Sequence, residues 1–141
     1  MKIQIAQTDE EIQACFPVMH ELRPHIEAGE FLSRVREQGC SGYRLAFVNT
    51  EDGVVAVAGF RLAETLAWGR FLYVDDLVTL STQRSKGYGT GLLAWLKTYA
   101  AEHGCVQLHL DSGLQRTEAH HFYECEGLVK SGFHFAGDIP Q

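Results

Sequence analysis

Hydrophobic and polar positions in the first third of the chain follow strand spacing and then helix spacing. Residues 2–6 alternate polar and apolar side chains, which is typical of a half-buried strand. The run Thr8–Glu11 has the form of a capping box, so a helix is predicted to begin there and to continue until Pro24 interrupts it. A second helix is predicted over residues 26–38, with Gly39 ending it in a left-handed conformation.

The middle of the chain changes to β-type patterning. Residues 43–49 and 54–61 are rich in strand-forming residues, and the Asp52-Gly53 dipeptide between them predicts an antiparallel hairpin. The long segment 70–80 is also β-rich. Beyond its first residue, its only charges are two adjacent carboxylates, Asp75 and Asp76.

The last third of the chain predicts a helix over 89–104, a strand over 106–111, a short helix over 117–126 and a last strand over 128–136. The predicted order is β-α-α-β-β-β-α-β-α-β, in which residues 70–111 form one crossover unit among hairpins. We therefore expect an α/β (α+β) fold with a mixed sheet flanked by helices. The 141 residues contain no linker or repeat and predict a single domain over 1–141.

Composition narrows the functional classes. Lys and Arg number 12 against 18 for Asp and Glu, and the net charge of -6 argues against a nucleic-acid partner. No apolar run approaches the roughly 18 to 20 residues of a membrane span, and the first residues lack the apolar core of a signal peptide. We expect a cytoplasmic protein with no membrane partner.

Cysteine and histidine spacing points away from a disulfide framework and from a metal centre. The four cysteines form no CxxC pair, so we expect them to be reduced and mostly packed. The pairs His20/His25 and His120/His121 are not spaced to put two imidazoles on one helical face, so no metal is expected.

The glycine-rich segment 83–91 joins the acidic strand to the long helix. Glycines let a backbone approach a ligand closely, and the N–H groups at a helix start favour phosphate. Arg84 and Lys86 add positive charge there. A plain strand-to-helix turn is the alternative. The segment lacks the Gly-Lys-Ser/Thr of a nucleotide-binding loop and the G-x-G-x-x-G of a dinucleotide-binding one.

Two motifs resemble the GCN5-related N-acetyltransferase (GNAT) family. Arg84-x-x-Gly87-x-Gly89 matches the family's (Gln/Arg)-x-x-Gly-x-(Gly/Ala) signature, and 119–128 resembles its A-x-x-F-Y-x-x-x-G-F helix, with Leu128 in place of the usual Phe. The resemblance implies a GNAT-like, mostly antiparallel sheet and acetyl-CoA as co-substrate. The loop would bind the pyrophosphate, and the main chain of 77–79 would pair with the pantetheine arm. The implied cofactor-binding residues are Leu77, Val78, Thr79, Arg84, Ser85, Lys86, Gly87, Tyr88, Gly89 and Thr90.

Acetyl transfer to an amine needs a base, oxyanion donors and a proton for the departing thiolate. Tyr123 matches the tyrosine that many relatives place near the CoA sulfur, and an ordinary packed tyrosine is its alternative. Asp75 and Asp76 are the candidate bases. In a regular strand only one of them can face a cleft, whereas a bulge could bring both near it. The pair resembles the acids of polyamine acetyltransferases, which favours Asp75, and solvated or structurally paired carboxylates are the alternative.

The acceptor is predicted as a small primary amine, polyamine-like or aminophosphonate-like. Glu21, Glu27 and Glu30 in the N-terminal segment favour a cationic amine, while 112–123 resembles small bacterial members that include aminoalkylphosphonate acetyltransferases. A protein or peptide acceptor and a non-catalytic acyl-CoA sensor remain as alternatives. The resemblance also implies a homodimer.

Overall fold

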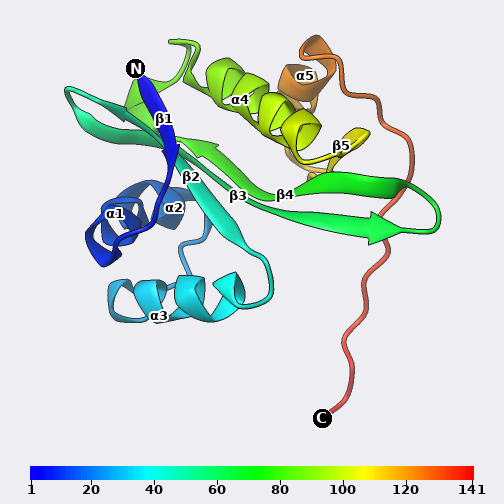
Figure 1. The fold of residues 1–141 in the computed structure, drawn as a ribbon, viewed down its shortest axis with the longest axis horizontal. Coiled ribbons are helices and arrows are strands. Elements are labelled where there is room, and N and C mark those ends of the chain that lie inside the picture. Colours follow the sequence, from blue (N-terminus) through cyan, green and yellow to red (C-terminus); the bar gives the residue numbers. More distant parts are fainter. The chain divides into compact units, whose positions relative to one another are not determined.

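The computed structural model describes all of residues 1–141 and consists of two compact units, Met1–Leu110 and Asp111–Gln141, each described by itself below. The elements are labelled in Figure 1. In the first unit they are β1 (Lys2–Ile5), α1 (Asp9–Ala14), α2 (Phe16–Leu22), α3 (Ala28–Gly39), β2 (Arg44–Thr50), β3 (Gly53–Thr65), β4 (Gly69–Thr79), a 3₁₀ turn (Ser81–Gln83), α4 (Tyr88–Glu102) and β5 (Gln107–Leu110). The second unit contains α5 (Thr117–Cys125).

The five strands form one sheet in the order β1-β2-β3-β4-β5. All neighbouring strands are antiparallel except β4 and β5, which are parallel and are connected by the crossover helix α4. The predicted mixed, mostly antiparallel sheet is therefore confirmed. The predicted hairpin at Asp52-Gly53 is also present, and Gly53 supplies the positive φ of +90° that its turn needs.

The strand β3 is longer than predicted. It continues to Thr65 and pairs with β4 over ten residue pairs, from Ala56↔Thr79 to Thr65↔Gly69. The second hairpin that results was not predicted, because residues 62–69 contain no Asn-Gly or Asp-Gly dipeptide.

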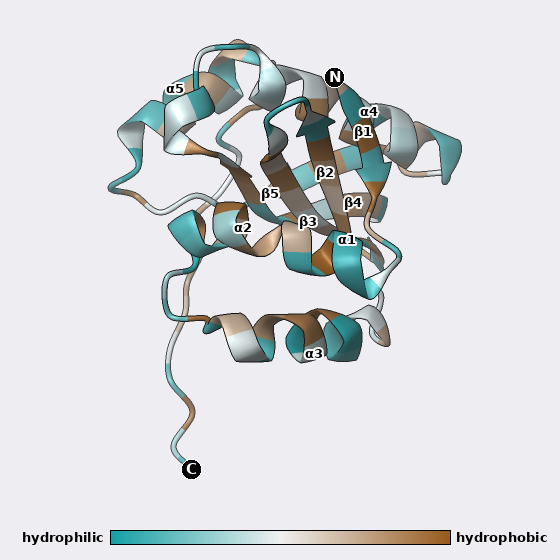
Figure 2. Cartoon of the chain, turned by 90° about the vertical axis from the view of Figure 1, so that its left-hand side faces the viewer, coloured by the Kyte–Doolittle hydropathy of each residue, from teal (hydrophilic) through white to brown (hydrophobic).

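Helices cover both faces of the sheet in the first unit (Figure 1). The helix α4 lies on one face, where the ring of Phe60 packs edge-on against Trp95 and Tyr99. The helices α1 to α3 lie on the other face, where Ile12 and Phe31 belong to a buried cluster. Residues of the strands between these layers are mostly hydrophobic (Figure 2). Their burial is the main stabilising contribution to the fold.

The N-terminal helices differ from the prediction in where they break. Pro17 lacks the N–H that would bond within one continuous helix, so α1 ends at Ala14 and α2 begins at Phe16. The capping box at Thr8 is confirmed. Gly39 does not end α3 in a left-handed conformation, because the helix includes it. The chain turns three residues later at Gly42, whose φ is +101°.

The predicted last strand over 128–136 is not formed, and the order of elements ends at α5. A strand needs a neighbour for its backbone hydrogen bonds, and the second unit contains no other strand. Its side chains that alternate toward one face are exposed, with Phe133 at 84% and Phe135 at 91% of full exposure. No helix of the structure combines the length and apolar character that crossing a membrane requires.

The four cysteines are free thiols, but they are not mostly packed as predicted. Only Cys15 is buried, and desolvation raises the pKa of its thiol to about 12, which makes it unreactive at neutral pH. Cys40 and Cys125 are exposed, and each lies at the end of a helix.

Candidate active site

A bulge in β4 brings the two adjacent carboxylates to one cavity. Gly59 pairs with Asp76 and Phe60 pairs with Val74, so Asp75 is the extra residue between two regular pairs. In a regular strand these neighbours would point to opposite faces of the sheet. Because of the bulge, Asp75 and Asp76 both line the same cavity.

This cavity has a volume of about 400 Å³, within the range of small-molecule sites. Its walls come from α2, the segment that follows it, α3, the residue before β2 and the part of β4 around the bulge. Apolar side chains such as Met19, Ile26 and Phe31 form part of the lining. The charged and polar lining residues are Arg23, His25, Arg34, Gln38, Tyr43, Tyr73, Asp75 and Asp76.

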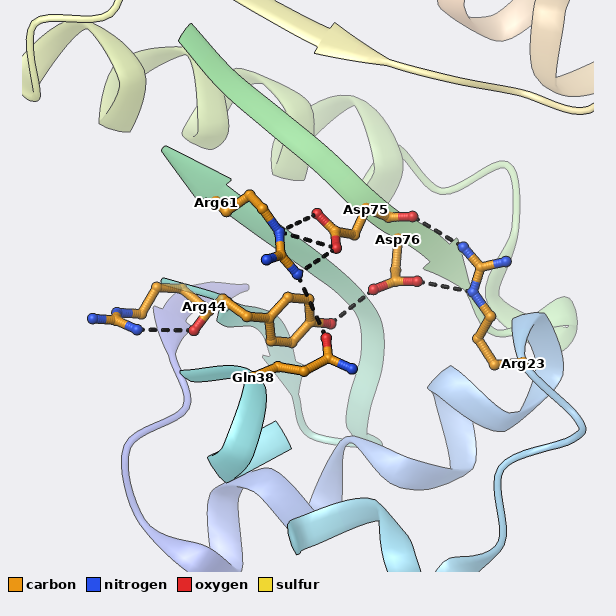
Figure 3. A network of polar contacts seen from close by, with 7 residues as sticks. Arg23, Gln38, Arg44, Arg61, Asp75 and Asp76 are labelled. Carbon is orange, nitrogen blue, oxygen red and sulfur yellow. Dashed lines mark hydrogen bonds and ion pairs between the residues drawn. The ribbon is translucent and has the colours of Figure 1, made fainter. Parts of the chain in front are cut away.

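Asp75 is held by an arginine from the neighbouring strand (Figure 3). Arg61 Nε lies 3.1 Å from Asp75 Oδ1, and Arg61 Nη2 lies 2.8 Å from Oδ2, which is a bidentate ion pair. The hydrogen bonds to Asp75 raise the pKa of Arg61 above its ordinary value, so the guanidinium stays charged. The guanidinium carbon Cζ of Arg61 also lies over the Tyr43 ring, 5.4 Å from the ring centre, which is a cation–π contact.

Asp76 is held by two different groups. The hydroxyl of Tyr43 donates to Asp76 Oδ2 at 2.8 Å, and Arg23 Nε donates to Oδ1 at 2.9 Å. Arg23 Nη2 also donates to the main-chain oxygen of Asp75 at 3.0 Å, so it fastens the end of α2 to the bulge (Figure 3). Burial, followed by the charge of Asp76, raises the pKa of Tyr43 well above 10, so its hydroxyl remains a donor.

Gly59 makes room for this network. A Cβ on Gly59 would collide with the Tyr43 hydroxyl oxygen and with Asp76 Oδ2, so any larger residue there would displace both groups. Gly59, Tyr43, Arg61 and Arg23 were not predicted as site residues. The one signal that could have found Arg61 is the register of the second hairpin: Arg61 pairs with Tyr73, and Asp75 is then its diagonal neighbour.

The three glutamates of the N-terminal segment that were expected to favour a cationic amine are engaged elsewhere. The Glu21 carboxylate accepts a hydrogen bond from Ser81 N at 3.0 Å, and Glu27 and Glu30 form the capping box of α3. All three carboxylates serve backbone N–H groups and none lines the cavity. The N-terminal segment instead contributes Arg23, His25 and Arg34 to it, and the two arginines carry the charge opposite to that of the glutamates.

The glycine-rich loop has the geometry that suits an anion. Ser85 and Gly87 both have positive φ, at 65° and 85°, and Gly87 is the N-cap of α4, which begins one residue earlier than predicted. The N–H groups of Tyr88 and Gly89 precede the first hydrogen bond of the helix, which Gly91 N donates to Gly87 O at 2.9 Å. The side chains of Arg84 and Lys86 are exposed, and Lys86 Nζ donates to Gln83 Oε1 at 3.0 Å. The loop thus presents main-chain donors and two basic side chains at the positive end of a helix.

One edge of β4 beside this loop has no strand partner. The strand β5 pairs with β4 only from Phe71 to Val74, and it ends at Leu110. Leu77, Val78 and Thr79 pair with β3 on their other edge. Main-chain groups at 77–79 can therefore take up an extended ligand as a strand would.

Tyr123 lies in the second unit, on α5. Its ring meets that of Phe122 at a centroid distance of 5.5 Å. Burial raises the pKa of Tyr123 above its ordinary value of 10, and Arg116 opposes this shift. The phenol therefore carries its proton throughout the neutral range.

Nowhere in the chain do three His, Cys, Asp or Glu side chains gather so that they could hold a metal ion.

The fold and both motif regions place the chain among the acetyltransferases. Residues 5–127 match the acetyltransferase (GNAT) family, and the chain belongs to this family. It is 34% identical over 117 residues to an uncharacterized N-acetyltransferase, YhdJ, of Bacillus subtilis, covering 81% of each chain. It is 33% identical over 94 residues to the aminoalkylphosphonate N-acetyltransferase of Salmonella typhimurium, covering 66% of this chain and 60% of that protein. The protein is thus an N-acetyltransferase.

Solved structures agree on the fold. A putative acetyltransferase from Agrobacterium tumefaciens superposes with a TM-score of 0.80 at 22% identity, covering all of both chains. The aminoglycoside acetyltransferase AAC(6')-Iy, solved with a bisubstrate analogue that contains CoA, superposes with a TM-score of 0.83 at 11% identity, also over all of both chains. The mixed sheet with its helices is therefore the GNAT fold.

Proposed function

We propose that this N-acetyltransferase transfers an acetyl group from acetyl-CoA directly to the primary amine of a small molecule. The observation that carries the proposal is the cavity of about 400 Å³ at the bulge of β4, which two carboxylates line. Carboxylates there can hold a substrate ammonium group and take its proton. The similarity to an aminoalkylphosphonate N-acetyltransferase favours a small molecule over a peptide acceptor.

Acetyl-CoA would be held mainly by main-chain groups. The loop Arg84–Thr90 and the start of α4 offer N–H donors to the pyrophosphate, and Arg84 and Lys86 add positive charge. The unpaired edge of β4 at Leu77–Thr79 would hydrogen-bond the pantetheine arm. This binding mode would place the thioester next to the bulge, since Leu77 follows the two carboxylates directly.

The proposed reaction is a direct attack of the amine on the thioester. Asp75, through a water molecule, takes the proton that the ammonium group must lose before its nitrogen can attack the carbonyl carbon. A strand N–H near Leu77 or Val78 stabilises the oxyanion. When the C–S bond breaks, Tyr123 gives its proton to the thiolate, and the proton that the attacking nitrogen then loses restores the phenol through solvent. The products are an acetamide and CoA. Asp75 is favoured over Asp76 because 24% of its side chain is exposed against 13%.

The experiment that tests the function combines calorimetric titration with acetyl-CoA and a thiol-release assay over small amines and peptides. We expect acetyl-CoA to bind and one class of small amine to be acetylated. Replacement Tyr123→Phe should lower kcat by about a hundredfold or more and leave the affinity for acetyl-CoA unchanged. Binding without turnover in the unmodified protein would favour the alternative of an acyl-CoA sensor. Absence of binding would overturn the assignment of the loop.

The homodimer and the cytoplasmic location stay predictions. Sedimentation of the purified chain at several concentrations tests the first of them, because a dimer in equilibrium with its monomer sediments faster as concentration rises.

A further inference from the structure

Neither carboxylate of the cavity at the bulge lacks a cationic partner within the protein. Asp75 is matched by Arg61 and Asp76 by Arg23. Arg34, on α3, is a further guanidinium in the lining, and His25 also lines the cavity. A ligand that is only cationic would therefore leave a positive group of the cavity without an anionic partner.

Arg34 is weakly engaged within the protein. Its ion pair with Glu30 is long, with 3.9 Å between Arg34 Nη1 and Glu30 Oε1, and 44% of its side chain is exposed. The same Glu30 oxygen already accepts the main-chain N–H of Glu27 at 2.9 Å. Exposed pairs of this type contribute little free energy. Most of the five N–H donors of the guanidinium can therefore be directed to a ligand.

Arg23 does not have this freedom. It bonds Asp76 through Nε and the main-chain oxygen of Asp75 through Nη2, so moving it would break the connection between α2 and the bulge. The two arginines thus have different roles: Arg23 fixes the carboxylates, and Arg34 faces the cavity with donors to spare.

We propose that the acceptor amine also carries an anionic group, such as a carboxylate or a phosphonate, and that Arg34 binds this group. This inference rests on the proposed function. The ammonium end of such a zwitterion lies toward Asp75 and Asp76, and its anion lies toward Arg34. A diamine instead brings its second ammonium group to the guanidinium, where like charges repel. The inference thus decides between the two small-amine classes that the sequence left open, in favour of the anionic one.

The first test compares four amines of similar length as substrates of the unmodified enzyme. They are 2-aminoethylphosphonate and β-alanine, which carry an anion, propylamine, which is otherwise neutral, and 1,3-diaminopropane, which is doubly cationic. We expect kcat/KM for at least one anionic amine to exceed that for propylamine by about tenfold or more, because a charged hydrogen bond is added. The diamine should be the poorest substrate. A diamine preferred over both anionic amines would overturn the inference.

The second test replaces Arg34. We expect Arg34→Gln to raise KM for the anionic amine by roughly 10- to 100-fold, with kcat little changed, since a binding contact is lost. Its kcat/KM for propylamine and its KM for acetyl-CoA should stay within about twofold, and Arg34→Lys should recover part of the affinity for the anion. An equal loss for all amines would show that Arg34 has a structural role and would overturn the inference.

Arg36→Gln is the matched control. Arg36 lies on the same helix and carries the same charge, but it bonds Asp9 and the main chain of Gln7 and does not line the cavity. It should leave the preference for anionic amines unchanged. If it changes this preference as much as Arg34→Gln does, the effect comes from net charge alone and the inference is wrong.

A binding measurement separates failure of this inference from failure of the proposed function. Titration of 2-aminoethylphosphonate into the protein saturated with CoA needs no turnover. If no amine is acetylated, the proposed function fails. Binding of the phosphonate that is lost in Arg34→Gln would then still support the anion site, and binding that is unchanged in the variant would reject it.

Discussion

At the scale of single residues, Asp75 and Asp76 differ in what holds them, although they are adjacent in sequence. Asp75 faces one bidentate arginine, whereas Asp76 receives a tyrosine hydroxyl and a second arginine. The sequence left two alternatives, catalytic bases at a cleft or structurally paired carboxylates. In the structure both carboxylates are paired, and both also line the cavity. Each carboxylate oxygen has two lone pairs, so a water molecule can still bond Asp75.

The role of Asp75 can be tested through pH. If Asp75 removes the amine proton, Asp75→Asn should lower kcat/KM at pH 7 by about a hundredfold or more. The loss should shrink as pH rises toward the amine pKa of about 10, because the amine then loses its proton to solvent. Initial rates over this pH range, for the variant and the unmodified enzyme, measure it.

Asp76→Asn is the comparison for this prediction. It removes the partner of Tyr43 and Arg23 and should lower the free energy of unfolding more than the rate. If the loss of kcat/KM depended on pH in Asp76→Asn and not in Asp75→Asn, Asp76 would be the base and Asp75 the structural carboxylate.

Glycine substitutions test the packing beneath the network. We expect Gly59→Ala to lower the free energy of unfolding by about 1 to 3 kcal/mol, because the new methyl group displaces the buried Tyr43 and Asp76. Gly29→Ala, on α3, meets nothing within 4 Å and should instead raise it by about 0.5 to 1 kcal/mol through helix propensity. Urea unfolding of both variants checks the signs. If both substitutions changed the free energy of unfolding by the same amount and in the same direction, the space around Gly59 would not be restricted.

At the scale of elements, hydrophobic periodicity was enough to predict every strand of the sheet and the crossover helix. Periodicity failed where forming an element also depends on hydrogen-bond partners that are distant in sequence or on a proline within the pattern. The alternation over 128–136 fits a strand, but no neighbouring strand exists within its unit. Pro17 broke a helix whose apolar spacing continues across it. The bulge could be given only as one of two alternatives, because it depends on the register between β3 and β4, which the sequence specifies only through the hairpin turn.

The glycine-rich loop offers an element-scale test. Gly87 has a φ of +85°, and an alanine in that region costs about 1 to 2 kcal/mol. In Gly87→Ala the loop should relax away from this conformation in the free protein, so acetyl-CoA must restore it. We expect its Kd to rise about tenfold, measured by calorimetry.

The matched control is Gly53→Ala, which has a similar φ of +90° in the turn between β2 and β3. It should lose stability like Gly87→Ala and keep the affinity for acetyl-CoA. If both variants lose affinity equally, the effect comes from general destabilisation, and the loop has no special part in binding.

At the scale of the whole molecule, buried side chains are found only in Met1–Leu110, and α5 contains none. A single domain over 1–141 stays a prediction. The bulge and the loop belong to one unit and Tyr123 to the other, and the catalytic roles assigned to these residues stay proposals. The sequence could predict this combination only because the two motifs resemble those of one family. Periodicity says nothing about how an amphipathic helix meets a cofactor.

Hydrogen exchange measured by mass spectrometry can show whether acetyl-CoA engages both units. Without ligand, α5 amides should exchange much faster than those around Leu92, Leu96 and Ala100 in α4, which are buried and open only with most of the fold. Acetyl-CoA should slow exchange in the loop Arg84–Thr90 and also in α5, since the proposed proton transfer requires Tyr123 to reach the thiol. Protection of the loop alone would remove Tyr123 from the reaction and leave the thiolate to take its proton from water.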